Sequence, residues 1–330
     1  MALTRTHVYV VRRHYTMPPR RGADVDDIRR IVESVKEWLR MSTQDIDQDL
    51  DERWRRDGYI LVPGLIHATQ ANQLRTLAEP ILSQWRQCNP ETGEAGGGVD
   101  ATVMRHLNHP EYFRQSGTSL VDLLQAVADP AVLDVCTTIL NAEPLFRCTS
   151  LFMNPQVNSQ DGNWHRDSQF HHADEEEERQ AIVGVGDLGR SVQLQIALVA
   201  SDDVEVVPGS HLRWDTTAEY AIRRANEQKD NRSSDMPGAL RVSLQPGDAV
   251  AFNPLALHRG RYHADKLRRT LMLTYTSSEH PRFDYFSDQP WFDDDGYLHG
   301  VDEHTCRFFS AFVERYGRDW RTKLAFPSNA

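Results

Sequence analysis

The stretch Asn163-Trp164-His165-Arg166-Asp167-Ser168 places an imidazole and a carboxylate two residues apart. If it is an extended strand, its side chains alternate between faces, and His165 and Asp167 point to one side, about 6–7 Å apart along the strand. A nitrogen donor and an oxygen donor so placed are two thirds of the 2-His-1-carboxylate triad, which holds Fe(II) on one face and leaves the other open. A surface ion pair is the alternative interpretation, and a metal site needs a third ligand from elsewhere in the chain.

The bulk properties narrow the class of partner. The chain has 330 residues, 39% of them hydrophobic, which is enough for a sizeable core in one large domain or two ordinary ones. Its formal net charge of −11, without a block of Lys and Arg, argues against nucleic-acid binding and favours a small-molecule partner. No apolar run is expected to reach the roughly 18 residues of a membrane helix, so no membrane partner is expected.

The four cysteines are widely scattered and form no Cys-x-x-Cys pair. This spacing indicates neither a zinc site nor a disulfide framework, so we expect a cytoplasmic protein. Residues 1–23 contain five arginines and precede the first acidic residue, Asp24. A basic N-terminal arm is favoured over a transit peptide.

The first part of the chain is predominantly helical in pattern. From Val25 to Met41 apolar residues recur at three- and four-residue steps, which predicts an amphipathic helix. Further helices are predicted over 45–57, 67–87 and 119–140, the last interrupted near Pro130, and a strand is predicted within 58–65. Residues 88–100 hold four glycines and read as a loop.

Strand-like runs dominate after Glu143 and are separated by turn residues. They cover 145–153, 164–168, 192–200, 204–208, 240–244, 248–253 and 270–276. Short strands with intervening turns favour an antiparallel sandwich or barrel, and a jelly roll is the natural candidate. The helices over 25–41 and 67–87 would cover one sheet, and a helix over 302–316 would close the chain.

We therefore predict one domain over residues 24–330. Its parts are a helical layer over about 24–142, an all-β core over about 143–278, and a C-terminal loop and helix over 279–330. Three polar segments, 171–180, 223–238 and 284–300, are candidate loops over the mouth of a site. For Glu175–Glu178 in the first of them, a solvated helix start is the favoured interpretation.

A candidate third ligand follows a predicted strand. Residues 245–258 read as a turn, an apolar strand and then His258, which could equally be a hydrogen-bonded core histidine. In the next strand, alternation puts Arg268 and Thr270 on one face. An inward guanidinium binds a carboxylate through two parallel hydrogen bonds, and the threonine hydroxyl can add a third. The alternative is that Arg268 and Arg269 are an exposed basic pair.

In order along the chain, four features resemble the motifs of the phytanoyl-CoA dioxygenase-like family of Fe(II)/2-oxoglutarate oxygenases. They are His165-Arg166-Asp167, Val206-Val207-Pro208-Gly209-Ser210-His211, Gly247-Asp248 ahead of His258, and Arg268. The resemblance covers residues 58–278 and implies a double-stranded β-helix, the jelly roll of this family, which agrees with the predicted strands.

The resemblance also implies the site. His165, Asp167 and His258 would bind Fe(II), and Arg268 would hold the distal carboxylate of 2-oxoglutarate beside Thr270, with Arg269 as the second choice. Gln193 is expected to reach the same pocket. His211 and Arg259 are candidate substrate-lining residues, although the Pro208-Gly209 turn also suits a structural His211. His171, His172 and His263 are competing metal donors.

The expected function is oxidation of a small molecule, by hydroxylation or a related reaction, with 2-oxoglutarate and O₂ consumed and succinate and CO₂ released. Chlorinating relatives lack the carboxylate ligand, so Asp167 favours oxygen transfer. Two alternatives stay open: a non-catalytic jelly-roll binding protein, and a cupin-like metal dioxygenase that does not use 2-oxoglutarate. The arginines Arg213, Arg259 and Arg261 would suit a carboxylated or phosphorylated metabolite, but the turn after His258 departs from the family pattern and leaves the substrate open.

Overall fold

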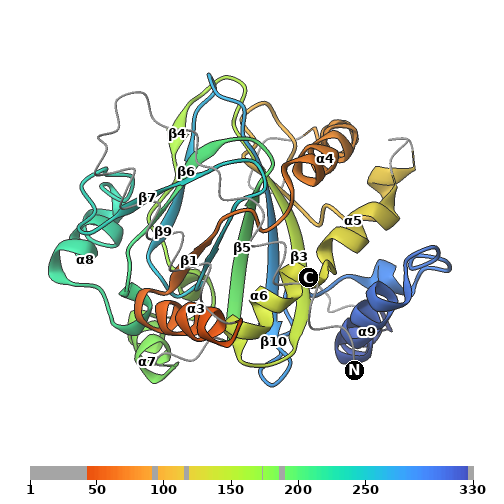
Figure 1. The fold of residues 1–330 in the computed structure, drawn as a ribbon. Helices are drawn as coiled ribbons and strands as arrows, with labels where there is room; N and C mark the ends of the chain where they lie inside the picture. Colours follow the sequence, from red (N-terminus) through yellow and green to blue (C-terminus); the bar gives the residue numbers. More distant parts are fainter. Residues whose placement is uncertain (1–42, 91–95, 115–118, 173, 186–189, 326–330) are drawn as a thin grey trace, which may run out of the picture.

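Two antiparallel sheets form the centre of the molecule in the computed structural model (Figure 1). The structure describes residues 43–90, 96–114, 119–172, 174–185 and 190–325, so the predicted arm 1–23 and the helix 25–41 lie outside the described residues. One sheet has the strand order β1-β8-β5-β10-β3-β2 and the other the order β4-β9-β6-β7. All the strand pairings are antiparallel.

The strands of the larger sheet are β1 (Tyr59–Val62), β2 (Val103–Arg105), β3 (Pro144–Met153), β5 (Ser191–Ala197), β8 (Ala249–Phe252) and β10 (Arg269–Ser277). Those of the smaller sheet are β4 (Gln160–Asp161), β6 (Ser201–Val206), β7 (Leu240–Leu244) and β9 (His258–Tyr262). The α-helices are α3 (Thr43–Asp57), α4 (Ala68–Cys88), α5 (Leu120–Val127), α6 (Pro130–Leu140), α7 (Glu175–Val185), α8 (Thr217–Arg223) and α9 (Glu303–Ala325).

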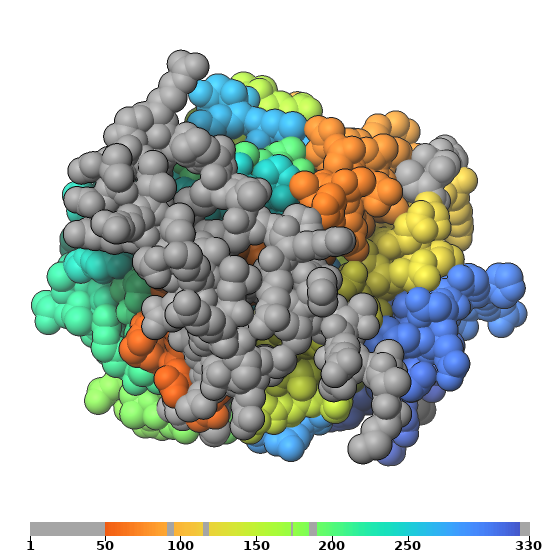
Figure 2. Space-filling model, viewed as in Figure 1, coloured from red at the N-terminus to blue at the C-terminus, as the bar shows by residue number. Residues whose placement is uncertain are grey.

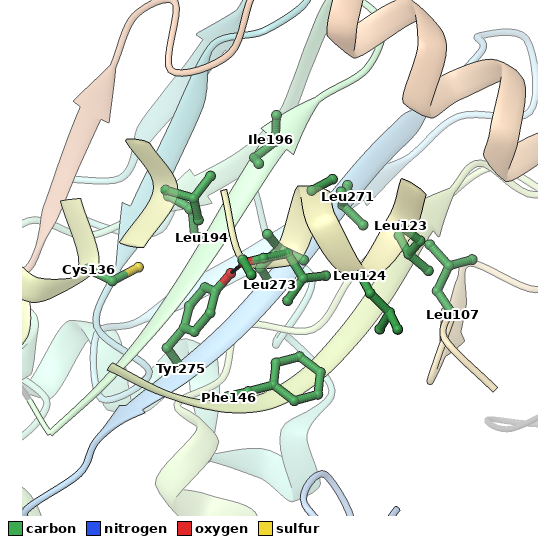
Figure 3. Close-up of a cluster of buried hydrophobic side chains, with 14 of the residues drawn as sticks. Leu107, Leu123, Leu124, Cys136, Phe146, Leu194, Ile196, Leu271, Leu273 and Tyr275 are labelled. Atoms are coloured by element: carbon green, nitrogen blue, oxygen red, sulfur yellow. Dashed lines mark hydrogen bonds between the residues drawn. The ribbon is translucent and has the colours of Figure 1, made fainter. Parts of the chain in front are cut away.

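The alternation of β10 and its neighbours separates an apolar face from a polar face. Leu271 and Leu273 point away from the smaller sheet and join Leu194 and Ile196 of β5 in the main hydrophobic core (Figure 3). On the opposite face, Thr270, Met272 and Thr274 of β10 lie beside Ala197, Gln195 and Gln193 of β5. This second face meets the smaller sheet, because Val250 and Phe252 of β8 share it and pack with Val204 and Val206 of β6.

Helices cover the apolar face of the larger sheet. Side chains of α4, α5, α6 and α9 enter the same core as β5 and β10, and the side chains of α4, α5 and α9 follow one another along one edge of the molecule (Figure 2). The hydroxyl of Tyr275, on β10, donates a 2.7 Å hydrogen bond to the carbonyl of Val127 at the end of α5. The predicted helical layer is therefore present over its described part.

The segment Leu120–Leu140 is long and apolar enough to cross a membrane by length and composition, so the expectation that the chain has no such run is wrong. The structure divides the segment into α5 and α6 at Asp129-Pro130, where the Asp129 carboxylate accepts the Ala131 N–H at 2.9 Å. Many of its apolar residues, Leu123, Leu124 and Val132 among them, are buried in the main hydrophobic core. Burial in a domain core accounts for this composition.

Most predicted strands are confirmed to within a few residues, but 164–168 is not a strand. His165 makes an isolated bridge to His258, and a 3₁₀ turn, η2 (Asp167–Phe170), begins two residues later. The helix predicted over 302–316 is longer, because Trp320 is also buried in the core and extends α9 to Ala325. The interpretation of Glu175–Glu178 as a helix start is confirmed by α7, but the run is not wholly solvated, because Glu178 is buried and accepts hydrogen bonds from Ser168 and Arg224.

Candidate functional site

The His165 and Asp167 side chains share one side although their segment is not a continuous strand. Arg166, between them, has extended backbone angles of φ −118° and ψ 141°, so the two flanking side chains still point the same way. The backbone is fixed on both sides. His165 exchanges two hydrogen bonds with His258, of 3.1 and 3.0 Å, and Asp167 N–H donates to the carbonyl of Pro254 at 2.9 Å.

His165, Asp167 and His258 form a compact donor cluster. Their ligand atoms all lie within 4.8 Å of one another. Among the described residues, these three form the group of His, Cys, Asp or Glu side chains that is close enough to hold a metal ion. The Asp167 Oδ1 atom is 3.6 Å from His165 Nε2 and 3.7 Å from His258 Nε2. The two imidazole centroids are 4.2 Å apart. Two imidazole nitrogens and one carboxylate oxygen grouped in this way match the 2-His-1-carboxylate arrangement, in which the three ligands occupy one face of the metal.

Each histidine is oriented by a backbone carbonyl two residues before it. His165 Nδ1 lies 2.8 Å from the Asn163 carbonyl oxygen, and His258 Nδ1 lies 2.9 Å from that of Ala256. A neutral ring donates its Nδ1–H there and leaves the Nε2 lone pair facing the cluster. Burial, with a smaller contribution from His165, lowers the pKa of His258 to about 4, so the ring is neutral at pH 7.

Gln193 supports the carboxylate from the floor of the site. Its Nε2–H donates a short hydrogen bond to Asp167 Oδ2, which leaves Oδ1 directed at the two histidines. Gln193 lies on β5 directly opposite Phe252 of β8, whose ring centroid is 4.7 Å from that of His258. The structure thus places Gln193 on the metal side of the pocket, where sequence analysis expected a co-substrate contact.

The Val206–His211 motif holds the two halves of the cluster together. Ser210 Oγ accepts the N–H of Leu257, the neighbour of His258, at 2.8 Å. The Ser210 carbonyl accepts a 2.7 Å hydrogen bond from Arg166, whose guanidinium is fully buried and also pairs with Asp215 at 2.9 Å. One residue of the motif therefore contacts both ligand-bearing segments.

His211, a candidate lining residue, is fully buried behind this framework. Its Nε2 lies 3.2 Å from the Arg55 carbonyl oxygen, and its ring packs on Gly58. A Cβ at Gly58 would lie 2.2 Å from His211 Nδ1, and Gly58 has a φ of +70°, so both space and conformation require glycine here. The second candidate, Arg259, lies over the Trp164 ring at 4.7 Å and pairs with Glu205.

Arg268 and Arg269 occupy opposite environments. Arg269 forms a two-pronged ion pair with Glu79 of α4, with distances of 2.8 and 2.9 Å. Arg268 has no exposed surface, lies 4.9 Å from the Tyr262 ring and 5.2 Å from the Phe152 ring, and makes one 3.1 Å hydrogen bond to the Arg261 carbonyl.

Several polar atoms around Arg268 have no partner among the described residues. They are Nε and Nη2 of Arg268 and the hydroxyls of Thr270 and Thr274. The nearest carboxylate is Asp203, whose Oδ2 is 3.7 Å from Arg268 Nε, beyond hydrogen-bond distance. Buried donors without partners are costly, so this set is suited to an anionic ligand that supplies acceptors.

A cavity of about 470 Å³ opens beside Asp167. Its lining includes Asp167, Gln193 and Thr274 together with His171 and His172, so these two histidines face the cavity without joining the donor cluster. Neither His211 nor Arg259 is among the described residues that line it. His263 lies elsewhere, 4.0 Å from Asp161.

Several solved structures share the fold of this chain at low sequence identity. EctD from S. alaskensis in its apoform has a TM-score of 0.53 and 18% identity, covering 76% of this chain and 83% of that chain. AviO1 from Streptomyces viridochromogenes Tue57 has a TM-score of 0.51 and 19% identity, covering 74% and 100%. EctD has also been solved with bound Fe, at a TM-score of 0.52 and 18% identity, covering 76% and 83%.

No curated protein sequence matches the chain. The family model described as "Phytanoyl-CoA dioxygenase (PhyH)" matches residues 54–270, which is more than half of the chain and includes the three donor residues, Gln193 and Arg268. The chain belongs to the phytanoyl-CoA dioxygenase family, whose enzymes are non-heme and depend on Fe(II), 2-oxoglutarate and O₂.

Proposed function

We propose that this protein is an Fe(II)/2-oxoglutarate-dependent dioxygenase that hydroxylates, or otherwise oxidises, a small-molecule metabolite. Its iron ligands would be His165, Asp167 and His258. The observation that carries the proposal is the convergence of their donor atoms within 4.8 Å, with both Nδ1 atoms held by backbone carbonyls. A histidine pair and a carboxylate with an open face are the donor set that Fe(II) oxygenases use.

Arg268 is the proposed partner of the distal carboxylate of 2-oxoglutarate. The unpartnered Nε and Nη2 atoms and the Thr270 hydroxyl would then gain the acceptor oxygens that they lack. Arg269 does not meet the same condition, because Glu79 already engages its guanidinium. The residues present therefore fit the co-substrate.

The two sheets would be the two halves of a double-stranded β-helix within one domain. This proposal is supported by the antiparallel pairing and by the single polar surface that β5 and β10 turn toward the smaller sheet. That surface carries the proposed contacts for both the metal and the co-substrate, and the helices on the far side of the larger sheet keep it rigid.

When bound, iron and 2-oxoglutarate together supply the activation of O₂ for oxidation of a substrate C–H bond, with succinate and CO₂ as the by-products. The chain's own residues would do the rest. Gln193 holds Asp167 so that Oδ1 faces the metal position, and the Asn163 and Ala256 carbonyls fix the imidazoles. Burial of Arg268 excludes water from the co-substrate carboxylate and strengthens the ion pair.

Asp167 also bears on the type of reaction. A carboxylate that occupies one ligand position, supported by Gln193, leaves no room there for a halide ion. Oxygen transfer is therefore the outcome we propose. The substrate would enter the cavity beside Asp167 rather than the region around Arg268.

The proposal is tested by aerobic incubation of the protein with Fe(II), 2-oxoglutarate and a panel of metabolites, with succinate release measured. Wild type should release succinate, and release should rise with a true substrate. Asp167→Ala should release none above the background of free iron. Release that is equal in wild type and Asp167→Ala would support the non-catalytic binding protein instead.

A further inference from the structure

The cavity beside Asp167 extends away from Arg268. Its lining includes Ser191, Gln193, Thr274 and Thr276, which are at the end of β5 and β10 opposite to Arg268. Arg268 and Thr276 are eight residues apart, about 27 Å along a strand at about 3.4 Å per residue. A molecule in this cavity would therefore approach the metal position from one end of the site, and 2-oxoglutarate, bound to Arg268, would approach it from the opposite end.

Three arginines line this far part of the cavity: Arg147, Arg190 and Arg282. Arg147 comes from β3 at the irregularity opposite Thr274 and Tyr275, and its side chain is 9% exposed. Arg190 directly precedes β5, and its carbonyl accepts the Thr276 hydroxyl at 2.7 Å. Arg282 follows β10 and is half exposed at the mouth.

The arginines outnumber the carboxylates that face them. Asp284 lies between two of them, bonded to Arg147 and 3.4 Å from Arg282 Nε. Arg147 Nε has no hydrogen-bond partner in the described part of the chain, although the residue is 7% exposed. Arg190 has no ion pair with a described residue. Asp284 does not line the cavity; among the described residues that do, the carboxylate is Asp167, and the metal would neutralise it.

The positive charge is confined to one end. The lining also includes the apolar side chains of Pro254, Leu255, Pro281 and Phe286, and the Arg147 guanidinium lies 5.4 Å from the Phe286 ring. The three arginines that the sequence suggested for an anionic metabolite do not line this cavity, and each has a carboxylate partner: Arg213 pairs with Glu219, Arg259 with Glu205, and Arg261 with Asp161. They leave no positive charge available for a ligand.

We infer that the substrate carries an anionic group, a carboxylate or a phosphate, joined by an apolar segment to the carbon that is oxidised. The inference rests on the proposed function for the position of the metal. The anion would bind to Arg147, Arg190 and Arg282, and the apolar segment would lie along Pro254, Leu255 and Phe286. The distal charge would fix which C–H bond stands next to Asp167.

The test uses three probes that share one alkyl chain: hexanoate, hexyl phosphate and the uncharged hexanamide. Each is titrated into the anaerobic Fe(II)/2-oxoglutarate form, and binding is measured from the rise in the unfolding temperature. Both anions should bind at least tenfold more tightly than hexanamide. Equal binding of hexanamide would overturn the inference, and a preference between the two anions identifies the group.

The matched variants separate this subsite from other anion sites. The double variant with Arg190→Gln and Arg282→Gln should weaken the binding of both anions at least tenfold without changing the binding of hexanamide. Arg307→Gln, on the exposed face of α9, should leave the binding of all three probes unchanged. Arg147→Gln is a second variant, to be used if it folds. Unchanged anion binding in the double variant would overturn the inference.

The same titration with the metal-free protein keeps the two proposals apart. If wild type forms no Fe(II)/2-oxoglutarate complex, the proposed function fails, yet anion binding that depends on Arg190 and Arg282 still supports the subsite. Anion binding that is lost in Arg268→Ala and kept in the double variant places the probe in the co-substrate pocket and contradicts the subsite.

Discussion

The two carboxylate oxygens of Asp167 have different partners. Oδ1 faces both histidines, and Oδ2 accepts the amide hydrogen bond from Gln193. Removing that donor in Gln193→Leu leaves the ligand set intact but frees the carboxylate to rotate. We predict about 10–100-fold weaker Fe(II) binding, the usual effect of losing a residue that orients a metal ligand.

This prediction is measured by anaerobic Fe(II) titration. Gln195→Leu is the matched control, because Gln195 lies two residues along β5 and contacts Met272 rather than a ligand. Fe(II) affinity equal to that of wild type in Gln193→Leu would show that Asp167 is held by its backbone alone.

Arg268 and Arg269 are adjacent in sequence, yet we predict that substitution of the first weakens 2-oxoglutarate binding and substitution of the second does not. Arg268→Lys keeps the charge but loses the planar fork, and it should weaken 2-oxoglutarate at least about tenfold through lost charge-assisted hydrogen bonds. Arg269→Lys should leave the affinity within about twofold, because Glu79 already engages the Arg269 guanidinium, and this partly exposed pair contributes only about 0–1 kcal/mol to folding stability. Equilibrium binding of 2-oxoglutarate measures both, and the reverse order would move the carboxylate contact to Arg269.

The sequence was sufficient to predict the three residues of the donor cluster, since alternation and motif order selected His165, Asp167 and His258. The same pattern selected Arg268, which the structure buries outside the cluster. The contacts around them could not be predicted. Gln193 reaches Asp167 only because β5 pairs with β8 in a particular register, and Arg147 enters the cavity at an irregularity in the β3–β10 pairing. Both depend on long-range packing rather than on local pattern.

At the scale of elements, Ser210 connects the 3₁₀ turn that follows β6 to the segment that precedes β9. Ser210→Ala leaves the buried Leu257 N–H without an acceptor, which costs about 1–3 kcal/mol of unfolding free energy. Denaturant unfolding measures this loss. Ser310→Ala on the exposed face of α9 is the control, with an expected change in unfolding free energy within about 0.5 kcal/mol. Equal midpoints for the two variants would contradict the proposed bracing role of Ser210.

The capping box of α8 predicts an acid-sensitive contribution to stability. Burial alone would raise the pKa of Glu219, but hydrogen bonds from Arg213 and the Thr216 N–H outweigh it, and the pKa lies below its usual value of 4.5. The folded carboxyl then binds its proton less readily than the unfolded one. This stabilisation is present above pH 4.5 and is lost as pH falls through the folded pKa.

Glu219→Gln should therefore lower the unfolding free energy at neutral pH by about 1–2 kcal/mol, the range for a lost helix cap or charged hydrogen bond. The gap from wild type should narrow below pH 4.5. Urea unfolding at several pH values checks this. A gap independent of pH would show that the charge of Glu219 does not contribute.

Strands whose residues alternate between apolar and polar could be predicted from the sequence, but β9 could not. Residues 258–262 contain Arg259, Gly260 and Arg261, so they lack the apolar alternation that indicates a strand. Their burial is compensated by ion pairs with Glu205 and Asp161 and by the Trp164 ring, all distant in sequence. For the opposite reason 164–168 looked like a strand, although the backbone turns at Asp167, whose N–H bonds the Pro254 carbonyl.

At the scale of the whole molecule, the proposed ligands lie on several distant segments. The cluster unites His165, just before η2, and Asp167, the first residue of η2, with His258 at the start of β9, and Arg268 directly precedes β10. Fe(II) and 2-oxoglutarate should consequently stabilise the folded state as a whole, by about 2.7 kcal/mol at 100 times the dissociation constant. Thermal unfolding with and without the two ligands measures this, and an unchanged midpoint would contradict a site assembled only by folding.

The central claim is that His165, Asp167, His258 and Arg268 form one Fe(II)/2-oxoglutarate site. Anaerobic addition of both ligands, followed by visible absorption of the Fe(II)-chelate charge-transfer band, tests it most directly. We predict the band in wild type, its loss in Asp167→Ala, and its appearance in Arg268→Ala only at much higher 2-oxoglutarate concentration. No band in wild type, or an undiminished band in Asp167→Ala, would contradict the claim.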